Sequence, residues 1–253
     1  MSKTSLKSND YLKVTYSEER APYGEYPLLF GKYLTERYYK TPGKILDLGC
    51  GRGDYLKVFR NLGLESYGTD ISNEAPNYVE NIPVEVSDLE NDEFPFQEIE
   101  FDFVFSKSVI EHMRDPMKLL AYSHQQLKQG GTAVILTPSW EHNYKGAFYI
   151  DHTHVTPWTR ASLEDALKIA GYEDVTVYYF YQLPILWKFP WLKIFSKLIS
   201  CLPIPYNPLH KVPWGVSNKL NKYVRFSKEV MLLDEKEQQC KIERRPGIPG
   251  TQS

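Results

Sequence analysis

An apolar run that ends beside an acidic residue and opens into closely spaced glycines is the feature that most constrains this chain. Residues 44–48 are rich in Ile and Leu and contain Asp47. The glycines that follow are Gly49, Gly51 and Gly53. The short apolar run predicts a buried strand, and the glycines allow a sharp turn that a ligand can approach closely. Residues 55–62 predict a helix that stops at Gly63, so the segment is the first half of a nucleotide-binding βαβ unit.

The details of this turn distinguish between two kinds of nucleotide cofactor. A dinucleotide fingerprint has a third glycine three positions after its second, and that position is Asp54 here. Asp47, two residues before the first glycine, would repel a pyrophosphate but suits a cationic group. The turn therefore favours a cofactor that carries positive charge over a dinucleotide.

Strand and helix patterns alternate after residue 43, which predicts an α/β fold with a mostly parallel sheet of seven strands. The strands after the first are expected at 64–70, 83–88, 101–106, 132–137, 175–180 and 228–233. Helices are expected over 23–40, from Pro116 (after an Asp115 N-cap) to Gln129, and from a cap at Thr159 or Ser162 to the stop at Gly171. About forty-five residues separate the last two strands, so an insertion lies between them.

The composition is that of an ordinary globular chain, and its charge excludes a strongly basic surface. The formal net charge is −2, which gives no indication of a nucleic-acid partner. The three cysteines, Cys50, Cys201 and Cys240, are widely spaced and form neither a disulfide framework nor a zinc pattern. Residues 1–10 are polar and lack the apolar core of a signal peptide, so a cytoplasmic location is expected.

The glycine turn resembles motif I of the class I S-adenosylmethionine (SAM) methyltransferases, whose cofactor carries an ammonium and a sulfonium. Residues 101–113, which end in Ile110, Glu111 and His112, resemble the fourth-strand motif of the ubiquinone-biosynthesis-like branch of that superfamily. This resemblance implies a Rossmann-like sheet whose last strand is antiparallel. It also implies methyl transfer from SAM, with S-adenosylhomocysteine (SAH) as the product.

The same resemblance implies a set of cofactor contacts at successive strand ends. Asp70 would accept hydrogen bonds from the ribose hydroxyls, and Asp88 would take the adenine amino group. Leu89 and Ile71 would pack on the two faces of the adenine ring, and Ser106 would lie near the methionine portion. The full predicted cofactor set is Asp47, Gly49, Cys50, Gly51, Gly53, Asp70, Ile71, Asp88, Leu89 and Ser106. Near the N-terminus, Tyr11, Tyr16, Arg20 and Tyr23 are expected to close over the cofactor or acceptor.

A long connection after the fifth strand carries the candidates for a general base. Residues 140–159 hold three of the six histidines of the chain. His152 and His154 project to one side in extended backbone, and either is expected to act as the base, with His112 shaping the site. Asp151, Glu111 or His112 would orient that base; the alternative is that one of the two histidines only ties down the loop. A metal site made of His152, His154 and Glu111 is the minority interpretation.

The acceptor is predicted from a second resemblance, separate from that of the cofactor motifs. Residues 151–159 are similar to a segment of methyltransferases found with bacterial capsule and O-antigen genes. That likeness implies O-methylation of a sugar, a sugar nucleotide or a phosphorylated precursor of a surface polysaccharide. The alternatives are a quinone- or lipid-type acceptor, an N-methyltransferase, or a SAM-binding scaffold without turnover.

The sequence divides the chain into five parts. They are an N-terminal helical cap (1–40), a SAM-binding core (41–181), an apolar insertion (182–222), a last core strand (223–233) and a disordered tail (234–253). Residues 191–202 predict an amphipathic helix that is too short to span a bilayer. The insertion is expected to form a lid over the acceptor pocket or a homodimer contact. The alternatives are contact with a membrane surface through residues 190–202 and binding of another biosynthetic protein.

Overall fold

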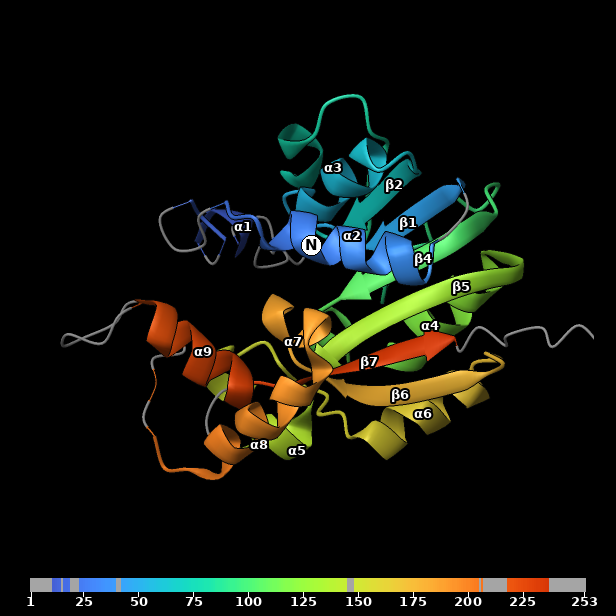
Figure 1. Ribbon diagram of the computed structural model, residues 1–253. Coiled ribbons are helices and arrows are strands. Elements are labelled where there is room, and N and C mark those ends of the chain that lie inside the picture. Colours follow the sequence, from blue (N-terminus) through green and yellow to red (C-terminus); the bar gives the residue numbers. More distant parts are fainter. Residues whose placement is uncertain are drawn as a thin grey trace, which may run out of the picture.

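The computed structural model describes residues 11–14, 16–18, 23–39, 42–144, 148–204, 206 and 218–236. A seven-stranded sheet runs through the middle of the protein with helices on both faces (Figure 1). The strand order is β3-β2-β1-β4-β5-β7-β6. The pairs from β3 to β5 are parallel, and β7 is antiparallel to both β5 and β6. The predicted fold class is confirmed.

The strands are β1 (Lys44–Leu48), β2 (Glu65–Asp70), β3 (Val84–Val86), β4 (Phe101–Lys107), β5 (Leu127–Pro138), β6 (Val175–Phe180) and β7 (Met231–Lys236). The α-helices are α1 (Tyr11–Val14), α2 (Tyr26–Arg37), α3 (Asp54–Asn61), α4 (Pro116–Gln125), α5 (Trp140–Asn143), α6 (Arg160–Ile169), α7 (Pro184–Lys188), α8 (Lys193–Cys201) and α9 (Asn218–Lys228). Short 3₁₀ turns are η2 (Ala75–Tyr78), η3 (Ile110–His112), η4 (Phe148–Ile150) and η5 (Pro190–Leu192).

Two apolar layers hold the helices on the sheet. On one face, Phe30 of α2 and Phe59 of α3 pack against Phe105 of β4, with the Phe59 and Phe105 ring centroids 5.3 Å apart. On the other face, Leu120 of α4 and Leu167 of α6 belong to a second cluster that also contains strand residues of β1 and β4. Because both faces are covered, ligands have access at the carboxyl ends of the parallel strands.

Local signals predicted several element boundaries correctly. Helix α6 begins at the expected cap, where Thr159 and Ser162 each bond to the other's backbone N–H in a capping box. It ends before Gly171, which has the left-handed φ of +100°. Asp115 and Pro116 stand at the start of α4 as predicted, but the Asp115 side chain makes no capping hydrogen bond.

The predicted end of α4 at Gln129 is wrong. The helix stops at Gln125, and residues from Leu127 onward already belong to β5. The Gln126 carbonyl accepts a hydrogen bond from the Phe101 N–H at 2.8 Å, and the Gln126 side chain bonds to the Pro95 carbonyl. Pairing with β4 therefore overrides the helical pattern that continues in the sequence.

The predicted last strand, 228–233, and the start of the tail at 234 also need correction. Residues 223–228 belong to α9, in which Asn221, Val224 and Ser227 are buried at helical spacing. Strand β7 begins at Met231 and continues to Lys236 because its register with β6 extends that far. Residues 237–253, the rest of the predicted tail, lie outside the described part of the chain.

The insertion between β6 and β7 folds as α7, η5, α8 and the first turns of α9. Helix α8 confirms the predicted amphipathic helix in its central part. Among the described helices, none is long and apolar enough to cross a membrane.

Candidate functional site

The glycine turn after β1 adopts a backbone that only glycine enters without strain. Gly49, Gly51 and Gly53 have φ values of +76°, +55° and +69°. A Cβ at Gly49 would lie 2.3 Å from Val109, and one at Gly53 would lie 2.1 Å from Val79. These two glycines therefore serve close packing. A Cβ at Gly51 would meet only a Leu12 methyl at 3.7 Å, so Gly51 lies where a ligand can approach the turn.

Asp47 presents a buried carboxylate beside this turn. Asp47 is only 2% exposed, and its Oδ2 atom has no hydrogen-bond partner. Burial raises the pKa of Asp47 well above its usual value, and the charge of Asp70 adds to this effect. A buried oxygen without a donor is costly unless a ligand supplies one, and the ammonium of SAM is a donor of the required charge. The residue therefore fits its predicted role.

Asp70 lies at the end of β2, as predicted, and its carboxylate already accepts several hydrogen bonds. The backbone N–H groups of Gly51 and Ser72 donate to it at 2.8 and 2.9 Å. The Tyr11 hydroxyl lies 2.8 Å from both carboxylate oxygens. A carboxylate offers about four acceptor positions, so Tyr11 holds the positions that two ribose hydroxyls would use.

The N-terminal segment is anchored over the turn by a buried arginine. Arg52, which lies between the second and third glycines of the turn, is only 7% exposed. It donates to the Tyr16 carbonyl at 3.0 Å, pairs with Asp54 at 3.1 Å and lies 4.2 Å from the centre of the Tyr23 ring. Sequence reasoning named these tyrosines without specific roles. Arg20 lies outside the described residues.

The remaining predicted cofactor residues lie at the same edge of the sheet. Ile71 is 40% exposed and follows Asp70 directly, whereas Leu89 is buried. The Asp88 carboxylate accepts hydrogen bonds from the Glu90 N–H and the Asn91 amide in its own turn. Ser106 is buried and donates to the Leu48 carbonyl at 3.3 Å. Cys50 is buried within the turn, where its thiol is not exposed for reaction.

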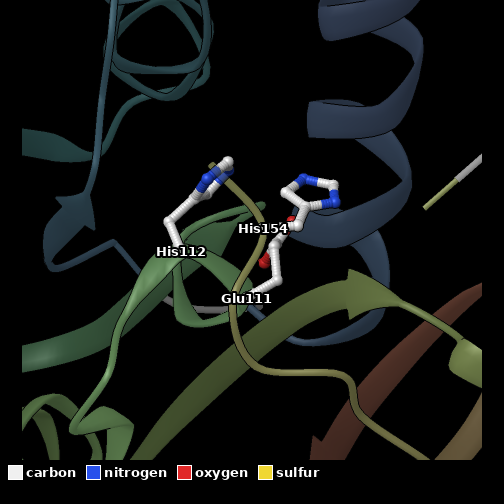
Figure 2. Close-up of side chains that lie close together, drawn as sticks. All are labelled: Glu111, His112 and His154. Carbon is white, nitrogen blue, oxygen red and sulfur yellow. The ribbon is translucent and has the colours of Figure 1, made fainter. Parts of the chain in front are cut away.

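A second group of side chains converges beyond the ends of β4 and β5. Glu111 and His112 lie on η3, directly after β4, and His154 reaches them from the connection after β5 (Figure 2). Their potential ligand atoms all lie within 4.8 Å of one another. The Glu111 carbonyl accepts hydrogen bonds from the Val155 and Thr156 N–H groups at 2.9 and 3.0 Å, which holds the two segments together.

The hydrogen bonds around His112 indicate which of its nitrogens carries the proton. Thr153 donates its only hydroxyl proton to Asp151 at 2.5 Å, so its oxygen accepts from His112 Nδ1 at 2.8 Å. Burial and neighbouring His154 lower the pKa of His112 to about 4. His112 is therefore neutral near pH 7, and its Nε2 carries a free lone pair.

Glu111 is the buried carboxylate of this cluster. One oxygen accepts a hydrogen bond from the Thr137 hydroxyl at 2.9 Å, and the other oxygen has no partner. Burial raises the pKa of Glu111 to about 7. His154 Nδ1 is likewise buried without a partner, and burial lowers the pKa of His154. Glu111 can therefore exchange a proton near neutral pH, whereas His154 stays neutral there.

The structure separates the two histidines that the sequence placed together. His154 belongs to the cluster, whereas His152 is exposed on the same loop. The described group with metal-ligand spacing is Glu111, His112 and His154, so the predicted metal set is corrected at one position. Sequence reasoning also missed Tyr11 and Thr137 as specific partners, because only tertiary contact brings them to Asp70 and Glu111.

The sheet order, the glycine turn and the two carboxylates at neighbouring strand ends define a Rossmann-like cofactor-binding protein of the class I methyltransferase type. A family model for the methyltransferase domain matches residues 24–177, which is more than half of the chain. The chain belongs to this family, whose cofactor is SAM.

Several relatives with assigned names match parts of the chain. A ubiquinone biosynthesis O-methyltransferase of Ruegeria sp. (strain TM1040) is 35% identical over 37% of this chain and 40% of that protein. Its counterpart in Ruegeria pomeroyi is 29% identical over 57% of this chain and 66% of that protein. A probable tRNA methyltransferase 9B of Mus musculus is 29% identical over 48% of this chain and 27% of that protein. The chain thus spans less than two thirds of each relative.

Solved structures share the fold at low sequence identity. A SAM-dependent methyltransferase from Archaeoglobus fulgidus superposes with a TM-score of 0.58 at 23% identity, over 88% of this chain and 98% of that chain. The plantazolicin methyltransferase BpumL in complex with SAH has a TM-score of 0.51 at 17% identity, over 84% and 82% of the two chains. These likenesses show the fold alone.

Proposed function

We propose that the chain transfers the methyl group of SAM to a hydroxyl group of a small acceptor, with His154 as the general base. The observation that carries this proposal is the cluster of buried Glu111 with half-buried His112 and His154. It lies past the end of β4, next to the strand whose turn suits the cofactor. Ligands of open α/β sheets bind at this edge. The glycine turn would therefore hold the methyl donor, and the cluster would contact the methyl acceptor.

SAM supplies an activated methyl group and leaves as the neutral thioether SAH. The acceptor oxygen forms the new bond to the methyl carbon as the carbon–sulfur bond breaks, and the hydroxyl proton passes to His154. Burial keeps His154 neutral and ready to accept that proton. Glu111, whose ligand atom lies within 4.8 Å of the His154 ring nitrogen, would stabilise the resulting imidazolium.

A sugar or another polar precursor of a bacterial surface polysaccharide is the acceptor that we propose from residues 151–159. The relatives named ubiquinone biosynthesis O-methyltransferases support a phenolic acceptor as the second candidate. Both acceptors present a hydroxyl group to the same base. They differ in acidity, since a phenol with a pKa near 10 needs less help from a base than a sugar hydroxyl.

A bound divalent cation is the alternative way to activate the acceptor at this cluster. It is favoured by the orphaned Glu111 and His154 atoms and by the free His112 Nε2, which together offer one oxygen and two nitrogen ligands. Metal-ligating histidines commonly donate their second N–H to a fixed partner, as His112 does to Thr153. The cation would replace His154 as the group that activates the hydroxyl.

Calorimetric titration with SAM, with and without EDTA, tests cofactor binding. Transfer of a labelled methyl group is then measured against sugar nucleotides, phenols, amines and bulk tRNA. We expect SAM binding and EDTA-insensitive transfer to a hydroxyl acceptor. Transfer abolished by EDTA and restored by a divalent cation would favour the metal alternative, and transfer to amines or tRNA alone would contradict the O-methylation proposal. Binding without transfer to any acceptor would leave a SAM-binding scaffold.

A further inference from the structure

Helix α8 exposes apolar side chains to solvent, and the residue that it buries against the protein is a serine. Ile194, Phe195 and Leu198 are 65%, 50% and 58% exposed, whereas Ser196 is fully buried. The three apolar residues occupy roughly 100° of the helix circumference. We propose that this face docks on the surface of an anionic phospholipid bilayer. The proposal does not depend on the identity of the acceptor.

The apolar stripe extends beyond the helix at both ends. Trp191, one turn before Ile194, is 62% exposed, and Leu202, one turn after Leu198, is 49% exposed. Single exposed apolar residues are common on soluble proteins, but a continuous row of them marks an interaction surface. Tryptophan and aliphatic residues on one helical side are typical of helices that lie in the membrane interface.

The charge around this stripe identifies the kind of surface that it fits. Lys193 and Lys197 are exposed on α8 and flank the apolar residues. Residues 175–228 contain seven lysines, one arginine and neither aspartate nor glutamate, although the whole chain has a formal net charge of −2. The lysines thus lie in the insertion and α9, whereas Arg225 is paired with Glu229, the next residue after this range. An anionic lipid surface complements these lysines, whereas a neutral or cationic surface does not.

The length of α8 favours a position along the membrane surface. The helix has nine residues, which is less than half of what is needed to cross a bilayer. An interfacial helix instead buries its apolar side by about 5–10 Å while its lysines stay at the headgroups. The buried side of α8 remains attached to the protein in this arrangement.

The proposed docking face lies near the acceptor side of the sheet. Helix α8 packs against α9, and both lie at the end of the molecule where α5 follows β5 (Figure 1). The Val230 carbonyl, just after α9, accepts hydrogen bonds from Ser139 and Asn143 at 3.0 and 2.9 Å. The charge of Lys197 contributes to the lowered pKa of His142 in α5, after burial as the main cause. Docking would therefore bring the connection after β5, which carries the proposed base, close to the lipid headgroups.

Co-sedimentation of the full-length protein with vesicles tests the proposal. We expect binding to vesicles of phosphatidylcholine mixed with phosphatidylglycerol and little binding to phosphatidylcholine alone. Binding should weaken when salt is raised from about 0.1 M to about 1 M, since the Debye length falls from about 10 to about 3 Å. Absence of binding to the anionic vesicles, or equal binding to both kinds, would overturn it.

Matched variants distinguish docking through α8 from nonspecific adsorption to the vesicles. Ile194→Ser combined with Leu198→Ser should lower the partition coefficient by about tenfold or more. Ile169→Ser is the control, because Ile169 is 77% exposed on α6, away from α8; its binding should match the wild type. Lys193→Gln and Lys197→Gln should each reduce binding by about fivefold.

Sedimentation velocity without lipid distinguishes a second copy of the chain as the occupant of this face. A monomer that binds anionic vesicles supports the proposal. A dimer that Ile194→Ser with Leu198→Ser dissociates, together with no vesicle binding, would show that α8 is a protein contact and would overturn the proposal. Circular dichroism confirms that each variant is folded, which is expected because the substituted side chains are exposed.

Discussion

The predicted cofactor side and the proposed acceptor side of this protein are built in different ways. On the cofactor side, Asp47 and the three glycines follow one another within seven residues, and backbone groups complete the site. On the acceptor side, Glu111, Thr137 and His154 come from three separate segments and meet only in the folded chain. The first is a local motif, whereas the second depends on how β4, β5 and the following loop are packed.

This difference determines how each side responds to substitution. A local turn fails through its own backbone conformation, so a single methyl group is enough to disturb it. An assembled cluster keeps its backbone when one side chain is removed and loses only the chemistry of that group.

The largest effect is expected from His154→Ala. Loss of a general base slows transfer by about 10²–10⁴-fold. SAM affinity should stay within about twofold of the wild type, because the glycine turn is untouched. Single-turnover transfer and a SAM titration measure the two quantities. His152→Ala is the control on the same loop, and an equal loss in that variant would contradict the assignment of the base to His154.

Gly49→Ala should damage the cofactor side through the fold itself. The new Cβ would lie 2.3 Å from Val109 at a φ of +76°, so we expect a loss of about 2–4 kcal/mol in the free energy of unfolding and much weaker SAM binding. Gly63→Ala is the matched control. It has a φ of +92° but open space around the new Cβ, so it should cost only about 1 kcal/mol. Denaturant melts compare the two, and equal losses would refute the close-packing argument.

The buried Glu111 should make stability depend on pH. Its pKa rises from 4.5 to about 7 on folding, so the folded protein binds more protons than the unfolded chain between these values. Stability from this group is therefore present below about pH 4.5 and is lost as pH rises toward 7 and above, by about 3 kcal/mol at most. In Glu111→Gln this loss should vanish. The measurement is the free energy of unfolding of each protein at pH 5 and at pH 8. A wild type and variant with identical pH profiles would contradict the raised pKa.

Tyr11→Phe is expected to have the smallest effect, and in the opposite direction. Removing the hydroxyl frees the two Asp70 oxygens for the ribose, so SAM should bind several-fold more tightly, equivalent to about 1 kcal/mol. Calorimetry measures this change. Tyr16→Phe is the control. The donors to the Asp70 carboxylate are Tyr11, Gly51 and Ser72, and Tyr16 is not among them. Weaker SAM binding in Tyr11→Phe would instead show that Tyr11 helps to hold the cofactor.

The sequence predicted the fold better than it predicted element ends. Each of the seven strands lies within or overlaps its expected range, because their apolar runs are buried between two helix layers. The errors occur where pairing between strands sets the end of an element. Gln126 leaves α4 to pair with β4, and Lys236 extends β7 along β6. Hydrogen bonds between strands distant in sequence leave no local signal.

The sheet class, the glycine turn and the acids at the ends of β1 and β2 could be predicted from the sequence, because they depend on residues close together in the chain. The folded chain was needed to show that His154 and not His152 joins Glu111 and His112, and that Tyr11 reaches Asp70. It was also needed to show that α8 exposes apolar side chains to solvent. Alternating and helical sequence patterns determine which side chains share a face of a strand or helix. Long-range packing determines whether that face contacts another element or solvent.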